Sequence, residues 1–109
     1  MITYDDFLKV DMRVGKVTKV EDFPQARNPS YKFEIDFGPE IGTKRSCAQL
    51  TNYSQDELMG RQIVAVVNFP PKNIAGFLSE VLILGVPMEG GVVSLLEPKD
   101  EAIIGGRVY

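Results

Sequence analysis

A chain of 109 residues, with 44% hydrophobic and 25% charged residues, fits one globular domain that buries roughly 65% of its unfolded surface. The formal net charge of −3 argues against a protein that binds nucleic acid through overall charge alone. There is no histidine and only one cysteine, Cys47, which excludes a Cys–His or Ser–His pair, a structural zinc site and an internal disulfide. We therefore expect a binding protein with no enzymatic activity, no metal and no other cofactor. No apolar run reaches the roughly 20 residues of a membrane span and no signal peptide is recognisable, so we expect a cytoplasmic protein without membrane insertion.

The N-terminal third predicts a helical turn and a long strand. A Thr-x-x-Asp capping box opens the turn at Tyr4–Lys9. Apolar residues then alternate over Asp11–Phe23, but the phase slips between Val14 and Val17. Gly15 lies at this slip, which predicts a bulge or a sharp coil, as in the long first strand of a small barrel.

The middle of the chain predicts two more strands and a helix. A turn at Pro24–Pro29 precedes Tyr31–Phe37, where apolar and charged residues alternate cleanly as in a strand with one buried face. Gly38–Thr43 reads as a hairpin connection to a third strand over Lys44–Leu50. Tyr53–Gly60 carries a Ser cap, an early Glu and a terminal Gly, and so predicts a short helix.

The last part of the chain supplies the remaining strands. Two apolar runs predict a fourth strand over Gln62–Val67 and a fifth over Glu80–Leu84. The loop that joins them contains Pro70 and Pro71 near its start. Gly90–Leu96 predicts a further strand, and Ile103–Val108 closes the chain. The whole pattern predicts a mainly all-β single domain over residues 1–109. We expect a five-stranded OB-fold barrel with a short helix between strands 3 and 4 and short N- and C-terminal extensions.

The loop between the fourth and fifth strands has a distinctive order of residues. It follows a valine-rich strand and reads Asn68-Phe69-Pro70-Pro71-Lys72, then Gly76-Phe77-Leu78-Ser79 before the next apolar strand. This order closely resembles the tRNA-binding OB-fold domain at the C-terminus of bacterial methionyl-tRNA synthetases and in free-standing relatives. Within that superfamily, the chain resembles the CsaA family of small, export-related, chaperone-like proteins. Three further segments carry that resemblance: Phe7–Val17, Phe23–Pro29 and Ile35–Gly42.

Two departures from the synthetase type also resemble the CsaA family. The synthetase-type domains read Pro-x-Ala-Asp/Glu-Lys-Leu where this chain has Pro-Gln-Ala-Arg-Asn-Pro at residues 24–29. They carry Val-Ser-Gly where this chain has Arg45 and Ser46 followed by Cys47. Cys47 itself reads as a small packing residue rather than a nucleophile.

The OB-fold binding surface is the face of strands two and three with the loops around it. RNA recognition needs cations for phosphates, amides and hydroxyls for base edges, and rings for stacking. The resemblance implies that the same face binds tRNA. The predicted RNA- or peptide-binding residues are Lys32, Arg45, Ser46, Gln49, Asn68, Phe69, Lys72, Phe77 and Ser79.

Two functions from different classes remain open. The resemblance to the CsaA family implies chaperone-like holding of unfolded or precursor polypeptides, which requires exposed apolar pockets or a free strand edge. The alternative is a dedicated binding protein for tRNA or structured RNA without a chaperone role. The third possibility is a dimeric domain that binds no ligand of its own. We expect the two ligands to compete for one surface.

The apolar residues of the C-terminal segment, Val92 to Ile104, exceed what a minimal barrel needs. They either plug the floor of the barrel or pack against a second subunit. The resemblance implies a homodimer through the terminal segments, and we expect one.

Overall fold

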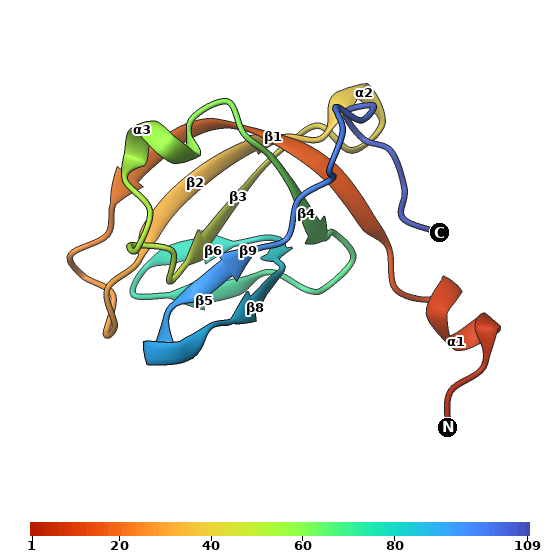
Figure 1. Cartoon of the computed structure of the whole chain (residues 1–109), viewed down its shortest axis with the longest axis horizontal. Coiled ribbons are helices and arrows are strands. Elements are labelled where there is room, and N and C mark those ends of the chain that lie inside the picture. Colours follow the sequence, from red (N-terminus) through yellow and green to blue (C-terminus); the bar gives the residue numbers. More distant parts are fainter.

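The computed structural model describes all 109 residues, and its centre is a five-stranded antiparallel sheet coiled into a partly open barrel (Figure 1). The strand order is β3-β2-β1-β4-β7. The predicted OB-fold barrel is therefore confirmed. The five strands are β1 (Met12–Asp22), β2 (Tyr31–Asp36), β3 (Thr43–Ala48), β4 (Gln62–Val66) and β7 (Leu82–Ile83).

Strand β1 is long enough to pair with two neighbours. Its first part pairs with β4 and its second part with β2. The register shifts between Val17 and Lys19, so the bulge expected at Gly15 lies further along the strand. At Gly15 itself, a Cβ atom would lie 2.5 Å from Ile35 Cγ2 and 2.7 Å from the Phe37 ring. The glycine is therefore explained by close packing against side chains of the neighbouring strand β2 and its end rather than by a bulge.

The core lies on the inner face of the coiled sheet. Phe33, Ile35 and Phe37 alternate along and just beyond β2 and are fully buried, which confirms the single buried face predicted there. Ile63 from β4 packs in the same cluster, as does Leu58 from the helix between β3 and β4. The barrel thus has one contiguous core, as expected for a chain of this length.

The chain also forms three short α-helices. A complete capping box, with Thr3 and Asp6 bonded to each other's backbone amides, opens α1 (Tyr4–Leu8), and Ser54 caps α3 (Gln55–Leu58) in the same way. Both predicted helices are confirmed. The β2–β3 connection, expected as a plain hairpin, contains a helical turn, α2 (Gly38–Ile41). None of these helices is long and apolar enough to span a bilayer.

The segment between β4 and β7 is more regular than expected. The sequence predicts a loop here, but the segment forms a β-hairpin of β5 (Lys72–Ile74) and β6 (Phe77–Ser79). The two turn residues, Ala75 and Gly76, have φ values of 49° and 86°, as a tight two-residue hairpin turn requires. This hairpin crosses the lower part of the barrel in Figure 1.

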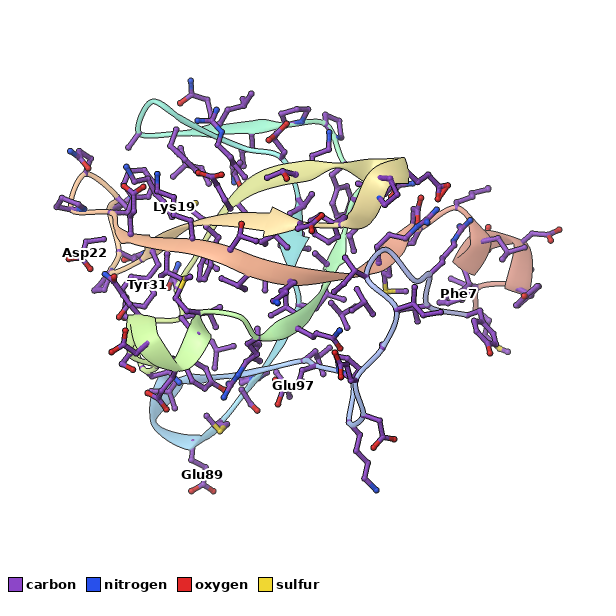
Figure 2. All side chains as sticks on the ribbon, turned by 90° about the horizontal axis from the view of Figure 1, so that it is seen from above. Phe7, Lys19, Asp22, Tyr31, Glu89 and Glu97 are labelled. Atoms are coloured by element: carbon purple, nitrogen blue, oxygen red, sulfur yellow. The ribbon has the colours of Figure 1, made fainter.

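A second hairpin follows β7. It joins β8 (Gly85–Pro87) to β9 (Val93–Leu95), with a 3₁₀ turn, η1 (Glu89–Gly91), at its tip. In Figure 2 Glu89 marks this tip, while Phe7 marks α1 at the opposite end of the molecule. The last residues return to β1, where Arg107 pairs with Arg13. The strand predicted over Gly90–Leu96 is therefore present but shorter.

Candidate ligand-binding groove

The barrel has a seam between its two outer strands, β3 and β7, which no ladder joins. One end of this seam is closed. The Glu80 N–H donates to the Arg45 carbonyl at 2.8 Å, and the Arg45 N–H donates to the Glu80 carboxylate at 2.9 Å. The Ser46 hydroxyl donates to the Val81 carbonyl at 2.7 Å. Beyond Ser46 no backbone hydrogen bond joins β3 to β7, and we call this part of the seam open.

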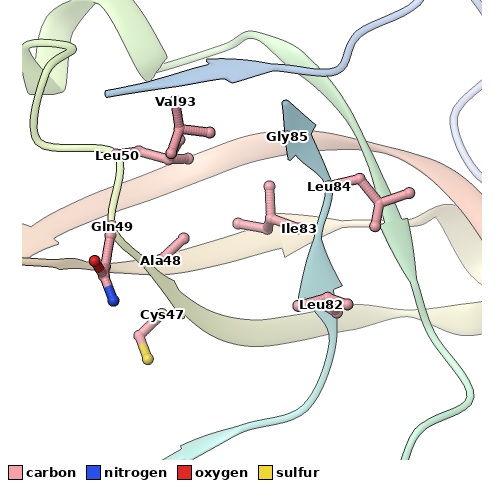
Figure 3. Close-up of a pocket in the computed structure, with 9 residues that line it drawn as sticks. All are labelled: Cys47, Ala48, Gln49, Leu50, Leu82, Ile83, Leu84, Gly85 and Val93. Carbon is pink, nitrogen blue, oxygen red and sulfur yellow. The ribbon is translucent and has the colours of Figure 1, made fainter. Parts of the chain in front are cut away.

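Three hollows adjoin at the open part of the seam, with volumes of about 400, 320 and 210 Å³. We call them, in order of volume, the largest, the middle and the smallest hollow. Cys47 lines all three, so together they form one surface depression, which we call the Cys47 groove. Figure 3 shows its middle hollow, with Cys47 and Gln49 on the β3 side and Leu82 to Gly85 on the opposite side. The groove also extends beneath the β5–β6 hairpin, where Phe69, Lys72, Ile74 and Ser79 line the largest hollow.

The walls of the groove are mainly apolar. Leu50, Ile83 and Val93 line the middle hollow, and Leu82 lies between the middle and the largest hollow. Leu82 is 50% exposed. Burial raises the pKa of the Cys47 thiol, while the Ser79 hydroxyl and the Lys72 charge act in the opposite direction. The Cys47 thiol therefore stays uncharged at neutral pH, and Lys72 supplies a positive charge in the largest hollow.

A cluster of rings and cations lies beside the groove. The Phe77 ring meets the Phe23 ring edge-on at a centroid distance of 5.6 Å. The Arg45 guanidinium lies 5.0 Å from the Phe77 centroid, and the Lys32 ammonium lies 5.7 Å from it. These are cation–π distances. The cluster ties the β5–β6 hairpin to β2 and β3 and presents two positive charges at the surface.

Most of the predicted site residues are brought together. Phe69, Lys72 and Ser79 line the largest hollow, and Gln49 lines the other two. The remaining members, Lys32, Arg45 and Phe77, form the adjacent cluster.

Two predicted residues hold the fold together. Ser46 has no exposed surface, and its hydroxyl donates a hydrogen bond to the Val81 carbonyl. The expectation of a direct ligand contact from Ser46 is therefore wrong. Asn68 is exposed, but its amide donates to the Lys9 carbonyl at 2.7 Å and accepts from the Asp11 N–H at 3.0 Å. It fastens the α1–β1 junction to the end of β4. We therefore remove Ser46 from the set of ligand contacts, whereas the exposed Asn68 stays a predicted contact.

Some lining residues were missed in the sequence. Cys47 had been interpreted as a packing residue only, and Leu82 and Ile83 as parts of a buried strand. Phe23, whose ring completes the cation–π cluster, was read only as the end of the first strand. No local signal marks these positions, because the groove exists only where strands distant in the chain meet. No group of Cys, Asp or Glu side chains is placed to hold a metal ion.

Residues 12–107 match the family described as putative tRNA binding domain, and the chain belongs to this family. Among solved structures, the chain is similar to the CsaA chaperone protein from Picrophilus torridus, with 53% identity and a TM-score of 0.95 over 100% of both chains. The chaperone CsaA of Bacillus anthracis strain Ames shares 52% identity, with a TM-score of 0.93 over 100% of this chain and 99% of that one. The resemblance to the CsaA family noted from the sequence is confirmed.

More distant relatives contain the domain within larger proteins. The methionine–tRNA ligase of Thermococcus onnurineus is 35% identical over 108 residues, which are 98% of this chain but 14% of the ligase. That of Pyrococcus abyssi is 36% identical over 107 residues, again 98% of this chain and 14% of the ligase. The chain thus spans about one seventh of the length of these relatives. Their ligase activity belongs to those whole proteins.

Proposed function

We propose that this protein holds unfolded polypeptides, including export precursors, in the Cys47 groove. The observation that carries the proposal is the continuity of this groove, whose apolar walls include the half-exposed side chains of Leu82 and Phe69. Contiguous exposed apolar surface on a small domain is typical of interaction sites. The similarity to CsaA chaperones at 52% and 53% identity supports a polypeptide as the ligand.

The dimensions of the groove favour a short stretch of chain rather than a folded surface. Hollows of about 210 to 400 Å³ hold a few side chains each. Gln49 and Ser79 lie on the rim and offer polar groups to a peptide backbone, while Lys72 adds a charge. A guest must therefore be locally unfolded to enter. The single cysteine favours a reducing compartment as the place where polypeptides are held.

A pair of matched substitutions tests the proposal. Leu82 and Val86 are exposed to nearly the same degree, 50% and 49%, but only Leu82 lines the groove. We expect Leu82→Asp to weaken binding of reduced, carboxymethylated α-lactalbumin by about tenfold or more, because it places a charge in the apolar groove. Val86→Asp serves as the control. Equal affinities of the two variants and the parent protein would refute the proposal.

A second candidate function is binding of tRNA or structured RNA through the cation–π cluster and Lys72. Lys32 lies 4.0 Å from the Glu21 carboxylate, which neutralises part of its charge, whereas Arg45 and Lys72 form no ion pair. Exposed cations next to a ring are the groups that RNA backbones and bases require. The family to which the chain belongs supports this candidate.

Substitutions also distinguish RNA binding from peptide binding. We expect Arg45→Ala with Lys72→Ala to weaken RNA binding and to flatten its salt dependence by about 0.7 for each lost phosphate contact, while leaving apolar peptide binding largely intact. Leu82→Asp, which changes the groove and not the cluster, should reduce peptide binding more than RNA binding. Lys16→Ala with Lys99→Ala removes two exposed lysines outside the groove and controls for net charge. Equal losses of both ligands in both variants would contradict this division of labour.

The groove and the cluster are neighbours, so the two ligands should exclude each other. Phe77 lies in the hairpin whose residues Lys72, Ile74 and Ser79 line the largest hollow. We expect an apolar peptide to displace bound tRNA in a fluorescence competition experiment at low salt. Simultaneous binding without mutual effect would show that the two sites are independent.

We further propose a homodimer through the terminal segments. Ile2, Tyr4 and Leu8 around α1 are exposed, and Ile103 is 82% exposed. Burying such apolar side chains between two subunits stabilises a small barrel. Sedimentation should give a dimer for the parent chain and a monomer for Leu8→Asp with Ile103→Asp. A parent chain that sediments as a monomer at high concentration would refute the dimer.

A further inference from the structure

We propose that the guest polypeptide binds as an added β-strand in the open part of the seam, hydrogen-bonded to β3 on one side and to β7 on the other. This inference rests on the proposed polypeptide-holding function and specifies how the guest is held. The partner is an extended, locally unfolded segment with apolar side chains at alternate positions. Its backbone amides, rather than its particular side chains, supply the specific contacts.

The edge of β3 offers backbone groups to such a strand. In an antiparallel ladder, alternate residues direct their N–H and C=O groups to opposite sides. The Arg45 carbonyl accepts from the Glu80 N–H, so Arg45 faces the seam, and Cys47, two residues further on, faces the same way. The Cys47 N–H meets only the Ser79 hydroxyl, at 3.3 Å. Its carbonyl is directed into the open part of the seam, where no strand is paired with it.

The edge of β7 faces this site from the other side. The Leu84 N–H donates to the Val64 carbonyl at 3.0 Å, which shows that Leu84 is bonded toward β4. Ile83, one residue earlier, lies opposite Ala65 and therefore directs its N–H and C=O away from β4, toward the seam. Figure 3 shows Ile83 and Cys47 on the two sides of the middle hollow. Two strand edges with unpaired backbone groups thus border the same hollow.

The surroundings explain why a strand, rather than an isolated side chain, fits here. Leu50, Leu82 and Val93 line the hollow with apolar surface, in which unpaired backbone groups are unfavourable. A guest strand pairs with these groups and directs alternate side chains toward the apolar wall. At the closed end, the carboxylate of Glu80 already occupies the Arg45 N–H, so pairing is confined to the segment beyond Ser46.

Backbone chemistry of the guest tests the inference. The probe is a short capped peptide in which Val and Thr alternate between a Lys at each end. We compare it with an analogue in which alternate amides are replaced by esters, which keeps the shape but removes N–H donors. We expect the ester analogue to bind about tenfold or more weakly. Equal affinities, or no binding of the Val/Thr peptide by a protein that does bind unfolded α-lactalbumin, would overturn the added-strand inference alone. Failure to bind α-lactalbumin would reject the proposed function as well.

Hydrogen exchange gives a second readout within the protein. We expect the Val/Thr peptide to slow exchange of the Ile83 amide by about tenfold or more, because that N–H gains a partner. The Leu84 amide, already bonded to the Val64 carbonyl, is the matched control and should be unaffected. Bound peptide with unchanged exchange at Ile83 would show that the guest lies on the groove without joining the sheet.

Discussion

Ser46 and Val81 close one end of the barrel seam: the Ser46 hydroxyl donates to the Val81 carbonyl at 2.7 Å, in a position with no exposed surface. The bond joins β3 to the residue just before β7. It lies next to the groove but cannot be reached from it. Ser46 therefore shapes the site without touching a ligand.

We expect Ser46→Ala to lower the free energy of unfolding by about 1–3 kcal/mol, because the Val81 carbonyl would be left buried without a donor. Urea titration measures the loss. The affinity of the folded protein for peptide should stay the same. Ser79→Ala is the control, since the Ser79 hydroxyl is partly exposed and its bond from the Cys47 N–H is a weaker one of 3.3 Å. Reduced peptide affinity with unchanged stability in Ser46→Ala would restore Ser46 as a ligand contact.

Asn68→Ala should loosen the N-terminal segment. The variant loses the bonds to the Lys9 carbonyl and the Asp11 N–H, and we expect a cost of about 1–2 kcal/mol. Faster hydrogen exchange of the Asp11 amide is the direct measurement. Asn68→Asp keeps the acceptor but not the donor, and it should have an intermediate effect. If RNA binding falls while exchange at Asp11 is unchanged, Asn68 acts on the ligand after all.

Cys47 should report on occupancy of the groove. Because burial raises the pKa of its thiol, folding keeps Cys47 protonated to higher pH, and only the thiolate reacts with maleimides. We expect labelling at neutral pH to be slower in the folded than in the urea-unfolded protein, and to accelerate as the pH rises through the shifted pKa. Bound peptide should protect Cys47. Faster labelling of the folded protein at neutral pH, or no protection by peptide, would contradict this picture.

Ala75→Asn should stabilise the β5–β6 hairpin. Ala75 has a φ of 49°, a left-handed conformation that is costly for alanine and better tolerated by asparagine, and the Asn-Gly pair suits the two-residue turn. We expect a gain of about 0.5–1 kcal/mol in unfolding free energy, measured by the shift of the urea midpoint. Ala75→Val should shift the midpoint in the opposite direction. A lower midpoint for Ala75→Asn would mean that the turn geometry is different.

The elements that sequence patterns predicted best are those determined by neighbouring residues. The alternation over Tyr31–Phe37 has the period of a strand, and its apolar members are the buried ones. The capping pattern at the N-terminus likewise involves residues three apart. The β5–β6 hairpin was missed because its turn is Ala-Gly rather than Asn-Gly and because two prolines precede it.

The groove depends on contacts that no local pattern reveals. Asn68 is bonded to partners 57 and 59 residues away in the chain, which no local pattern reveals. Ser46 alternates with exposed residues in β3 but lies under the segment that ends the β5–β6 hairpin. The resemblance indicated the correct region of the fold. Which side chains in it face outward is decided by how the barrel closes.

Gly15 sets a limit for anyone who wishes to re-engineer this scaffold. With no room for even a methyl group against Ile35 and Phe37, the packing of β1 beside β2 can be altered only by rebuilding the aromatic interior. The outward neighbours Lys16 and Thr18 carry no such constraint, since both are exposed. Neither residue lines the groove, so purification handles or fluorophores can be attached there while cargo preference is varied at the groove residues.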